Sequence, residues 1–171
     1  MKLTKKDLEI ILQEGEGQTI EFKESFTSFV VRDIVAFANS IGGKVFIGVD
    51  DTGKIKGINI TNKLKSQVTD MARNCDPFIP VYLQTLGNVL AVIVDEGVNK
   101  PYQCKDGFFL RQGPNSQKLT RDQIIQFYID EDKIKFDSQI NIKFKYPEDF
   151  SRDLFKQYFT DISVKMSLKC R

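Results

Sequence analysis

The chain has 171 residues, of which 41% are hydrophobic and 28% are charged, and its formal net charge at pH 7 is +2. These values are typical of a water-soluble globular protein with a buried core. The net charge is far below that of the strongly basic proteins that are dedicated to binding nucleic acid. The absence of histidine excludes Ser-His and Cys-His nucleophile pairs and imidazole metal ligands, so any catalysis would depend on carboxylates, lysines, tyrosines or a metal bound by oxygen atoms.

Residues 4–41 predict a helix, a strand and a second helix. Thr4 is a suitable N-cap for the first helix, and Gly15 stands where this helix would end. In the segment QTIEFKE the side chains alternate, with Ile20 and Phe22 on one face of a strand and polar residues on the other. An apolar stripe at helical spacing then predicts the second helix, and its members are Val30, Ile34, Phe37, Ala38 and Ile41.

Residues 38–53 read ANSIGGKVFIGVDDTG and contain a glycine pair and two adjacent carboxylates. In a phosphate-binding loop the glycines follow a strand and open a helix, whereas Gly42 and Gly43 follow a helix and open a strand. We therefore interpret the pair as a helix stop and a tight corner. Asp50 and Asp51 leave the central strand KVFIGV, and two interpretations stay open for them, a turn cap or part of an acid/base or metal site.

Residues 62–130 predict a helix, two hairpins, a polar loop QGPNS and a last helix. The first hairpin turns at Gly87-Asn88, and the second, shorter one turns near residues 105–107. Thr120 and Gln123 form a capping-box pattern at the start of the last helix. The apolar residues of the two helices are Leu64, Val68, Met71, Ala72 and Cys75 in the first and Ile124, Ile125 and Tyr128 in the second. The pattern predicts an α+β fold, a single domain with a mixed, mainly antiparallel sheet packed by helices.

The tail predicts a C-terminal strand-helix extension. Ile140, Ile142, Phe144 and Tyr146 alternate with polar residues, and a helical pattern follows at Phe150, Leu154, Phe155 and Tyr158. The tail is either the start of a further domain or a frayed terminus.

Cysteine usage and hydropathy indicate the cellular compartment. Cys75, Cys104 and Cys170 are widely spaced and form no CxxC pattern, which predicts buried reduced thiols rather than disulfides or a zinc site. No apolar run approaches the ~20 residues of a membrane span, and the N-terminus lacks the apolar stretch of a signal peptide. We therefore expect a cytoplasmic protein without membrane partners.

The segments EGEGQTIEFKES and DIVAFANSIGGKVFIGVDDTGKIKGI resemble the Schlafen AlbA-type domain, and so does GFFLRQGPNS followed by the LTRDQI helix. We therefore divide the chain into an N-terminal helix over 1–13, a Schlafen AlbA-type domain over 14–130 and the C-terminal extension over 131–171. The resemblance implies a nucleic-acid-binding module at the N-terminus of a bacterial or archaeal transcriptional regulator, with DNA rather than RNA as the expected ligand.

The same resemblance implies a second function, because related domains in animals cleave structured RNA with two glutamates and an aspartate. Matched to their motifs, the carboxylates are Glu16, Glu21 and Asp51, with Lys23 beside them. Such oxygen ligands could hold Mg²⁺ or Mn²⁺ and activate water in a metal-dependent endoribonuclease. The animal nucleases pair two such lobes and carry a Cys/His zinc site, which this chain lacks. Glu21 and Lys23 could equally be the polar face of a strand.

For phosphate contacts the sequence favours Lys23 and, in and beside the QGPNS loop, the residues Arg111, Gln112, Asn115 and Ser116. As an alternative, Arg111 pairs with a carboxylate such as Asp51 or Glu21. A third function is a dimerisation or protein-interaction domain, since the exposed strand edges of such a sheet favour a homodimer.

Overall fold

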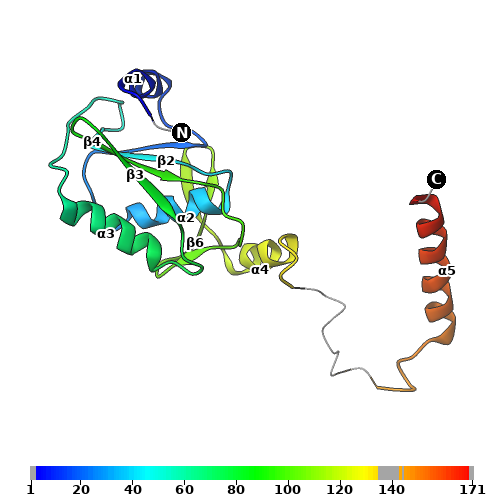
Figure 1. Ribbon diagram of the computed structural model, residues 1–171. Helices are drawn as coiled ribbons and strands as arrows, with labels where there is room; N and C mark the ends of the chain where they lie inside the picture. The colour runs from blue at the N-terminus through cyan, green and yellow to red at the C-terminus, as the bar shows by residue number, and fades with distance from the viewer. Residues whose placement is uncertain (1–2, 135–142, 144, 170–171) are drawn as a thin grey trace. The chain divides into compact units, whose positions relative to one another are not determined.

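The computed structural model describes residues 3–134, 143 and 145–169. The chain divides into two compact units, residues 1–134 and residues 135–171, and each is described by itself (Figure 1).

The first unit is built around a four-stranded sheet. Its strands are β1 (Ile20–Lys23), β2 (Gly43–Ile47), β3 (Val81–Leu86) and β4 (Val89–Val94), in the order β1-β2-β4-β3. β1 runs parallel to β2, and the other two pairings are antiparallel. The predicted α+β fold with a mixed, mainly antiparallel sheet is confirmed.

Helices cover both faces of this sheet, with α1 (Lys5–Glu14) on one side and α2 (Val30–Asn39) and α3 (Asn62–Arg73) on the other (Figure 1). The alternation of the strands divides the core accordingly. Phe22 and Phe46 point toward α1, whereas Val45 and Ile47 point toward α2 and α3. α2 is buried along nearly its whole length because it packs between two sheets.

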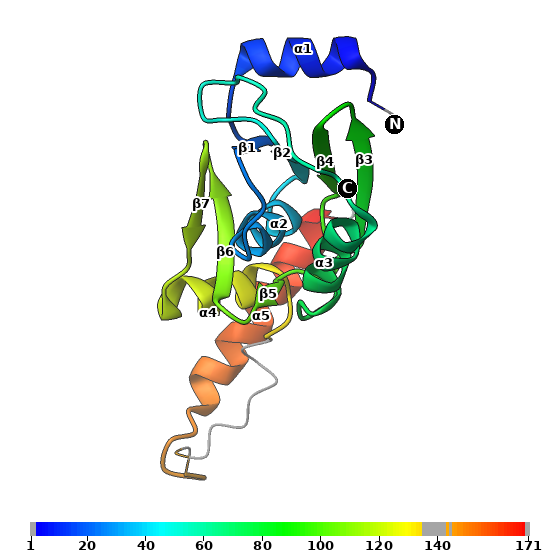
Figure 2. The ribbon, with the colours of Figure 1, turned by 90° about the vertical axis from the view of Figure 1, so that its left-hand side faces the viewer.

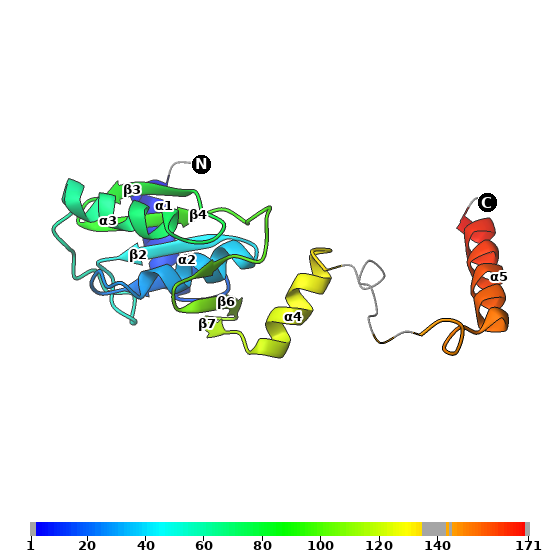
Figure 3. The same cartoon turned by 90° about the horizontal axis from the view of Figure 1, so that it is seen from below.

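The second sheet consists of β5 (Gln103–Cys104), β6 (Gly107–Gln112) and β7 (Asn115–Lys118), all antiparallel. Figures 2 and 3 show β6 and β7 alongside α2, which contacts both β2 and β6. The loop predicted over QGPNS is wrong in part, since only Gly113 and Pro114 form the turn and Asn115 begins a strand. Gly113 takes a φ of 58°, which lets the chain reverse in two residues.

The predicted helix signals are confirmed at three ends. Thr4 and Thr120 both form capping boxes, the second with Gln123 at the start of α4 (Arg121–Asp130). Gly15 ends α1 with a φ of 80°.

The glycine pair forms the predicted corner. The helix before it ends at Asn39, and Gly42 has a φ of 81°. A Cβ on Gly42 would lie 2.8 Å from the carbonyl oxygen of Val94, and one on Gly43 would overlap the Phe37 ring. Close backbone approach therefore explains both glycines without a bound phosphate.

Two predicted core positions are wrong. Ile41 is 62% exposed, because α2 ends before it and the chain turns toward β2. Ile125 is 47% exposed, and α4 has no fully buried residue. Tyr128 is half-buried and meets the Phe108 ring edge-on, with 6.1 Å between the ring centroids.

The second unit contains α5 (Arg152–Lys169), which confirms the predicted C-terminal helix. Of the strand predicted over Ile140, Ile142, Phe144 and Tyr146, the first three residues lie outside the described residues, and Tyr146 is in a turn. No helix among the described residues combines the length and apolar content needed to cross a membrane.

Candidate nucleic-acid interface

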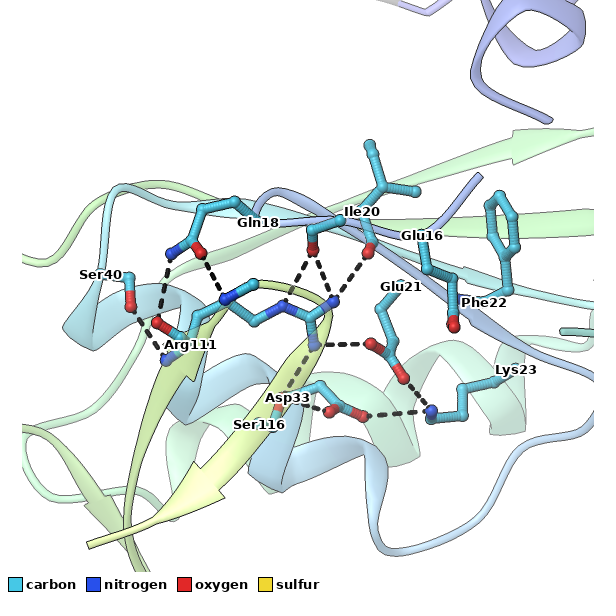
Figure 4. A network of polar contacts seen from close by, with 12 residues as sticks. Glu16, Gln18, Ile20, Glu21, Phe22, Lys23, Asp33, Ser40, Arg111 and Ser116 are labelled. Carbon is cyan, nitrogen blue, oxygen red and sulfur yellow. Dashed lines mark hydrogen bonds and ion pairs between the residues drawn. The ribbon is translucent and has the colours of Figure 1, made fainter. Parts of the chain in front are cut away.

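Arg111, at the end of β6, lies inside the protein. Its side chain is inaccessible to solvent, and its guanidinium carbon lies 4.8 Å from the centroid of the Phe37 ring. All five guanidinium N–H groups find acceptors (Figure 4). These acceptors are the carbonyl oxygens of Gly17 and Ile20, the Glu21 carboxylate at 2.6 Å and Ser116 Oγ at 3.1 Å.

This arrangement answers one alternative left open by the sequence. Arg111 pairs with Glu21 and ties β6 to the loop before β1, so no guanidinium N–H is left to meet a phosphate. The geometry therefore gives Arg111 an internal role in place of the predicted phosphate contact.

Two buried carboxylates and a lysine complete a charged network beside this arginine. Glu21 accepts hydrogen bonds from Arg111 through one oxygen and from Lys23 Nζ through the other. Ser116 Oγ accepts a hydrogen bond from Arg111 and donates one to Asp33 Oδ1 at 2.7 Å. Lys23 Nζ lies 3.9 Å from the second Asp33 oxygen, and its side chain remains about one-third exposed. We call these five residues the charged network.

Burial shifts the proton affinities within the network. Desolvation raises the pKa of Asp33, and the negative charge of Glu21 adds to the rise, although the hydrogen bond from Ser116 opposes it. Burial pushes the pKa of Lys23 down, but the Glu21 hydrogen bond and the charge of Asp33 raise it by more. Lys23 therefore carries a firm positive charge at the edge of the network.

Glu16 lies near the network without joining it. Its Oε1 accepts the Phe22 N–H at 2.8 Å, which fixes the loop before β1. Burial raises the pKa of Glu16, and the charges of Glu21 and Asp51 raise it further, against the effect of the Phe22 N–H. The predicted carboxylates thus lie close enough to influence one another.

The carboxylates nevertheless do not form a metal centre. Among residues 3–134, 143 and 145–169, no group of three or more His, Cys, Asp or Glu side chains is placed to hold a metal ion. Both carboxylate oxygens of Glu21 already accept hydrogen bonds from cationic side chains, and Asp51 is exposed in a turn. A Mg²⁺ or Mn²⁺ ion at Glu16, Glu21 and Asp51 does not fit this donor set, since Arg111 and Lys23 already balance the charge of Glu21.

Asp50 acts as the turn cap. Its Oδ1 accepts hydrogen bonds from Thr52 Oγ1 at 2.6 Å and from the N–H groups of Thr52 and Lys54, both at 3.0 Å. These bonds, led by the Thr52 hydroxyl, lower the pKa of Asp50 to about 2. The turn-cap interpretation therefore describes Asp50.

Asp50→Asn is expected to lower the urea midpoint of unfolding at pH 7. A depressed carboxyl pKa contributes stability above the unfolded value near 4, and this contribution is lost as the pH falls toward about 2. The gap between wild type and variant should therefore shrink between pH 4 and pH 2 in urea titrations followed by circular dichroism. Asp51→Asn, one residue along, is the matched control; an equal loss in both variants would contradict the turn cap.

Exposed polar residues line the outer edge of β7. β7 is an edge strand of the second sheet in the described part of the chain, so half of its backbone N–H and C=O groups face outward. Lys118 shares one face with Ser116, and Asn115 and Gln117 lie on the other. Lys23 lies across Asp33 from Ser116. We call Lys23, Asn115, Gln117 and Lys118 the β7 rim.

The turn of the β6–β7 hairpin is held in place from outside. Gln18 Oε1 accepts the Gly113 N–H at 2.8 Å, and its Nε2 donates to the Arg111 carbonyl oxygen at 3.2 Å. The predicted residues Gln112 and Asn115 are exposed on either side of this turn. The structure thus brings Lys23, Asn115 and Ser116 to one region, where hydrogen bonds with Gln18 fix the turn.

The sequence analysis missed three residues that build this region, Gln18, Asp33 and Lys118. Asp33 sits on the apolar side of a helix pattern, where a carboxylate predicts a buried partner. Gln18 and Lys118 carry no such signal, because their positions depend on how β7 folds back.

A family model described as Schlafen, AlbA_2 matches residues 16–120, which is more than half of the chain. The chain belongs to the Schlafen AlbA_2 family. Every residue of the charged network and of the β7 rim lies within this AlbA_2 domain.

Two solved structures are similar to the chain. The DIP2311 protein from Corynebacterium diphtheriae is 18% identical with a TM-score of 0.49, over 65% of this chain and 24% of that one. The N-terminal domain of an ATP-dependent DNA helicase RecG-related protein from Nitrosomonas europaea is 21% identical with a TM-score of 0.44, over 71% of this chain and 92% of that one. At such values neither structure bears on function. Among curated proteins nothing matches the sequence.

Proposed function

We propose that the AlbA_2 domain binds nucleic acid, with DNA preferred to RNA, as a module of a transcriptional regulator. In this proposal the β7 rim contacts the phosphate backbone. The observation that carries the proposal is an exposed edge strand with polar and cationic side chains, paired with a strand that a fully hydrogen-bonded buried arginine anchors to β1. Family membership supports the same function.

The chemistry of the rim suits phosphate. Lysine ammonium groups, amide side chains and outward backbone N–H groups are the donors that proteins commonly direct at phosphate oxygens. Lys23 and Lys118 supply the charge, and Asn115 and Gln117 supply amide N–H groups. Asp33 lies between Lys23 and Ser116, but it is buried and already accepts a hydrogen bond from Ser116, which limits its repulsion of an anion.

The small net charge determines the affinity for nucleic acid that we expect. A net charge of +2 and two rim lysines predict few released counterions and therefore modest affinity, of the order of 10⁻⁴–10⁻⁶ M for non-specific binding at physiological salt. Binding that tightens at low salt is the expected pattern.

Cleavage has weaker support than binding. The carboxylates predicted for the nuclease do not gather as a metal centre among the described residues, and Glu21 is bonded to Arg111 and Lys23. Self-association through a strand edge stays a prediction, which the mass of the purified protein from light scattering would test.

The test is fluorescence anisotropy with a labelled DNA duplex, a DNA single strand and an RNA duplex, at several salt concentrations. Lys118→Ala is expected to weaken binding to every probe and to reduce the slope of log K against log salt by about 1, as for one lost phosphate contact. Asn115→Ala is expected to weaken binding without changing that slope.

Lys63→Ala is the matched control, because Lys63 is an exposed lysine on α3, which packs against β3 rather than β7. The proposed role of the β7 rim would be overturned by an absence of binding at low salt. Equal losses of affinity for Lys63→Ala and Lys118→Ala would overturn it as well. A parallel incubation of the protein with RNA and Mn²⁺ distinguishes binding from the alternative function. RNA cleavage that Asp51→Asn abolishes would favour the endoribonuclease.

A further inference from the structure

Two of the three cysteines, Cys75 and Cys104, flank an isolated bridge of antiparallel backbone. Asp76, just after α3, and Gln103, in β5, form an isolated antiparallel bridge. Each donates its N–H to the carbonyl oxygen of the other, at 2.9 and 2.8 Å. Cys75 precedes Asp76 and Cys104 follows Gln103, so the bridge brings the two cysteines close together, and both belong to the same core cluster. Facing Cα atoms in this arrangement are about 4.5–5.5 Å apart, within the span of a disulfide.

The side chains of the bridge determine the direction of the thiols. Gln103 Nε2 donates to Asp76 Oδ2 at 3.4 Å on the solvent side of the bridge. Cys75 and Cys104 lie on the buried side, because both belong to the same core cluster and only 6% and 8% of their surface is exposed. Burial, followed by the charge of Cys104, raises the pKa of Cys75 to about 12, as expected for neighbouring sulfur atoms.

We propose that Cys75 and Cys104 are an oxidation site that forms an intramolecular disulfide when the protein meets a hydroperoxide. An adjacent cavity of about 230 Å³ offers the oxidant a route to the pair. It is lined by Ser28, Val31, Met71, Asn74, Cys104 and Lys105. Cys104 lines this cavity and Cys75 is not among its lining residues, so we assign the first step to Cys104.

The reaction balances with the hydroperoxide as the two-electron oxidant. The Cys104 sulfur attacks the terminal oxygen of the hydroperoxide, the O–O bond breaks, and the leaving alkoxide takes up the thiol proton to give an alcohol and a sulfenic acid. The Cys75 sulfur then attacks the Cys104 sulfur, and the displaced hydroxide leaves as water with the Cys75 proton. Two thiols and one hydroperoxide thus become one disulfide, one alcohol and one water.

The environment of Cys75 predicts the rate. Burial keeps Cys75 as a thiol at neutral pH, and the thiolate is the attacking species, so the second step is slow at pH 7 and accelerates as the pH rises. The weak bonds from Cys75 Sγ to the Met71 carbonyl oxygen and from Cys104 Sγ to that of Gly107 are lost when the bond forms.

The cross-link would join the end of α3 to the second sheet. Because a disulfide restricts the unfolded chain, the oxidised protein is expected to melt at a higher temperature than the reduced protein. This inference does not depend on nucleic-acid binding, and its experiment requires no nucleic acid.

The experiment uses the full chain with Cys170→Ser, which leaves Cys75 and Cys104 as the only thiols. After treatment of the folded protein with hydrogen peroxide, thiols counted in denaturant should fall from two to none, and the intact mass should fall by two hydrogen atoms. Dithiothreitol should restore both thiols and lower the melting temperature again.

Cys75→Ser and Cys104→Ser in the same background are the matched controls, because each keeps one buried thiol and neither can close the ring. Two outcomes would overturn the proposal. One is a folded Cys170→Ser protein that keeps both thiols or gains oxygen atoms in place of losing hydrogen. The other is a disulfide that forms only when denaturant is present during oxidation.

Discussion

Arg111→Met is expected to lower the free energy of unfolding by about 3–5 kcal/mol, the range for removing one partner of a buried ion pair. Methionine can fill much of the space beside Phe37 but cannot donate to the five acceptor contacts that the guanidinium makes. The Glu21 carboxylate would keep only Lys23, and the carbonyl oxygens of Gly17 and Ile20 would lose the hydrogen bonds that the guanidinium donates. Urea denaturation at pH 7 measures the loss.

Gln112→Ala is the matched control for this prediction, because Gln112 is the next residue along β6 and is exposed. A surface substitution of this kind should change the unfolding free energy by no more than about 0.5 kcal/mol. Arg111→Lys should recover little, since one ammonium group cannot reach acceptors on both β1 and the loop before it. If Arg111→Met were as stable as Gln112→Ala, the charged network would not hold the hairpin.

A double-mutant cycle isolates the pairing itself. Glu21→Gln combined with Arg111→Met should cost less than the sum of the two single variants, because the second change removes the charge that the first leaves buried. Additive losses would indicate that Arg111 acts mainly through Gly17 and Ile20.

Asn39→Asp is expected to cost more than about 3 kcal/mol at pH 7, because it buries a charge opposite carbonyl oxygens. Asn39 is buried at the end of α2, and its Nδ2 donates to the carbonyl oxygens of Tyr102 and Phe109 at 2.8 and 2.9 Å. Its Oδ1 accepts the Tyr102 N–H at 2.7 Å. An ionised aspartate would keep the last bond and repel the two carbonyl oxygens, which would loosen α2 from the second sheet.

The pH dependence of this variant provides its own check. An aspartate in this site would have a folded pKa above its unfolded value near 4, so stability is retained at low pH and lost as the pH rises through the folded pKa. The gap to wild type in urea titrations should therefore be smaller at pH 4 than at pH 7. Asn59→Asp, at an exposed position, should show no such trend. A gap for Asn39→Asp that is independent of pH would contradict the proposed repulsion.

Both predictions bear on function, because the β7 rim depends on where α2 and β6 hold the hairpin. A variant that loosens the hairpin should weaken nucleic-acid binding and stability together. By contrast, Lys118→Ala should weaken binding at unchanged stability. This difference distinguishes a residue that contacts nucleic acid from one that only stabilises the hairpin.

The sequence by itself determined the local structure of this protein. Thr4 and Thr120 cap their helices as predicted, Gly87 turns the first hairpin and the glycine pair makes a corner, because each depends on residues a few positions apart. The pattern over residues 16–120 also identified the family.

Only the tertiary structure decided what the charged residues do. Arg111 was an equally good phosphate ligand or ion-pair partner in the sequence, and it became internal because β6 places it beside Glu21, 90 positions earlier. The same folding used both oxygens of Glu21, and it exposed Ile41 where the helix had already ended. Periodicity and caps operate over one or two turns of chain, whereas a buried charge finds its partner through the packing of distant elements, which no local pattern encodes.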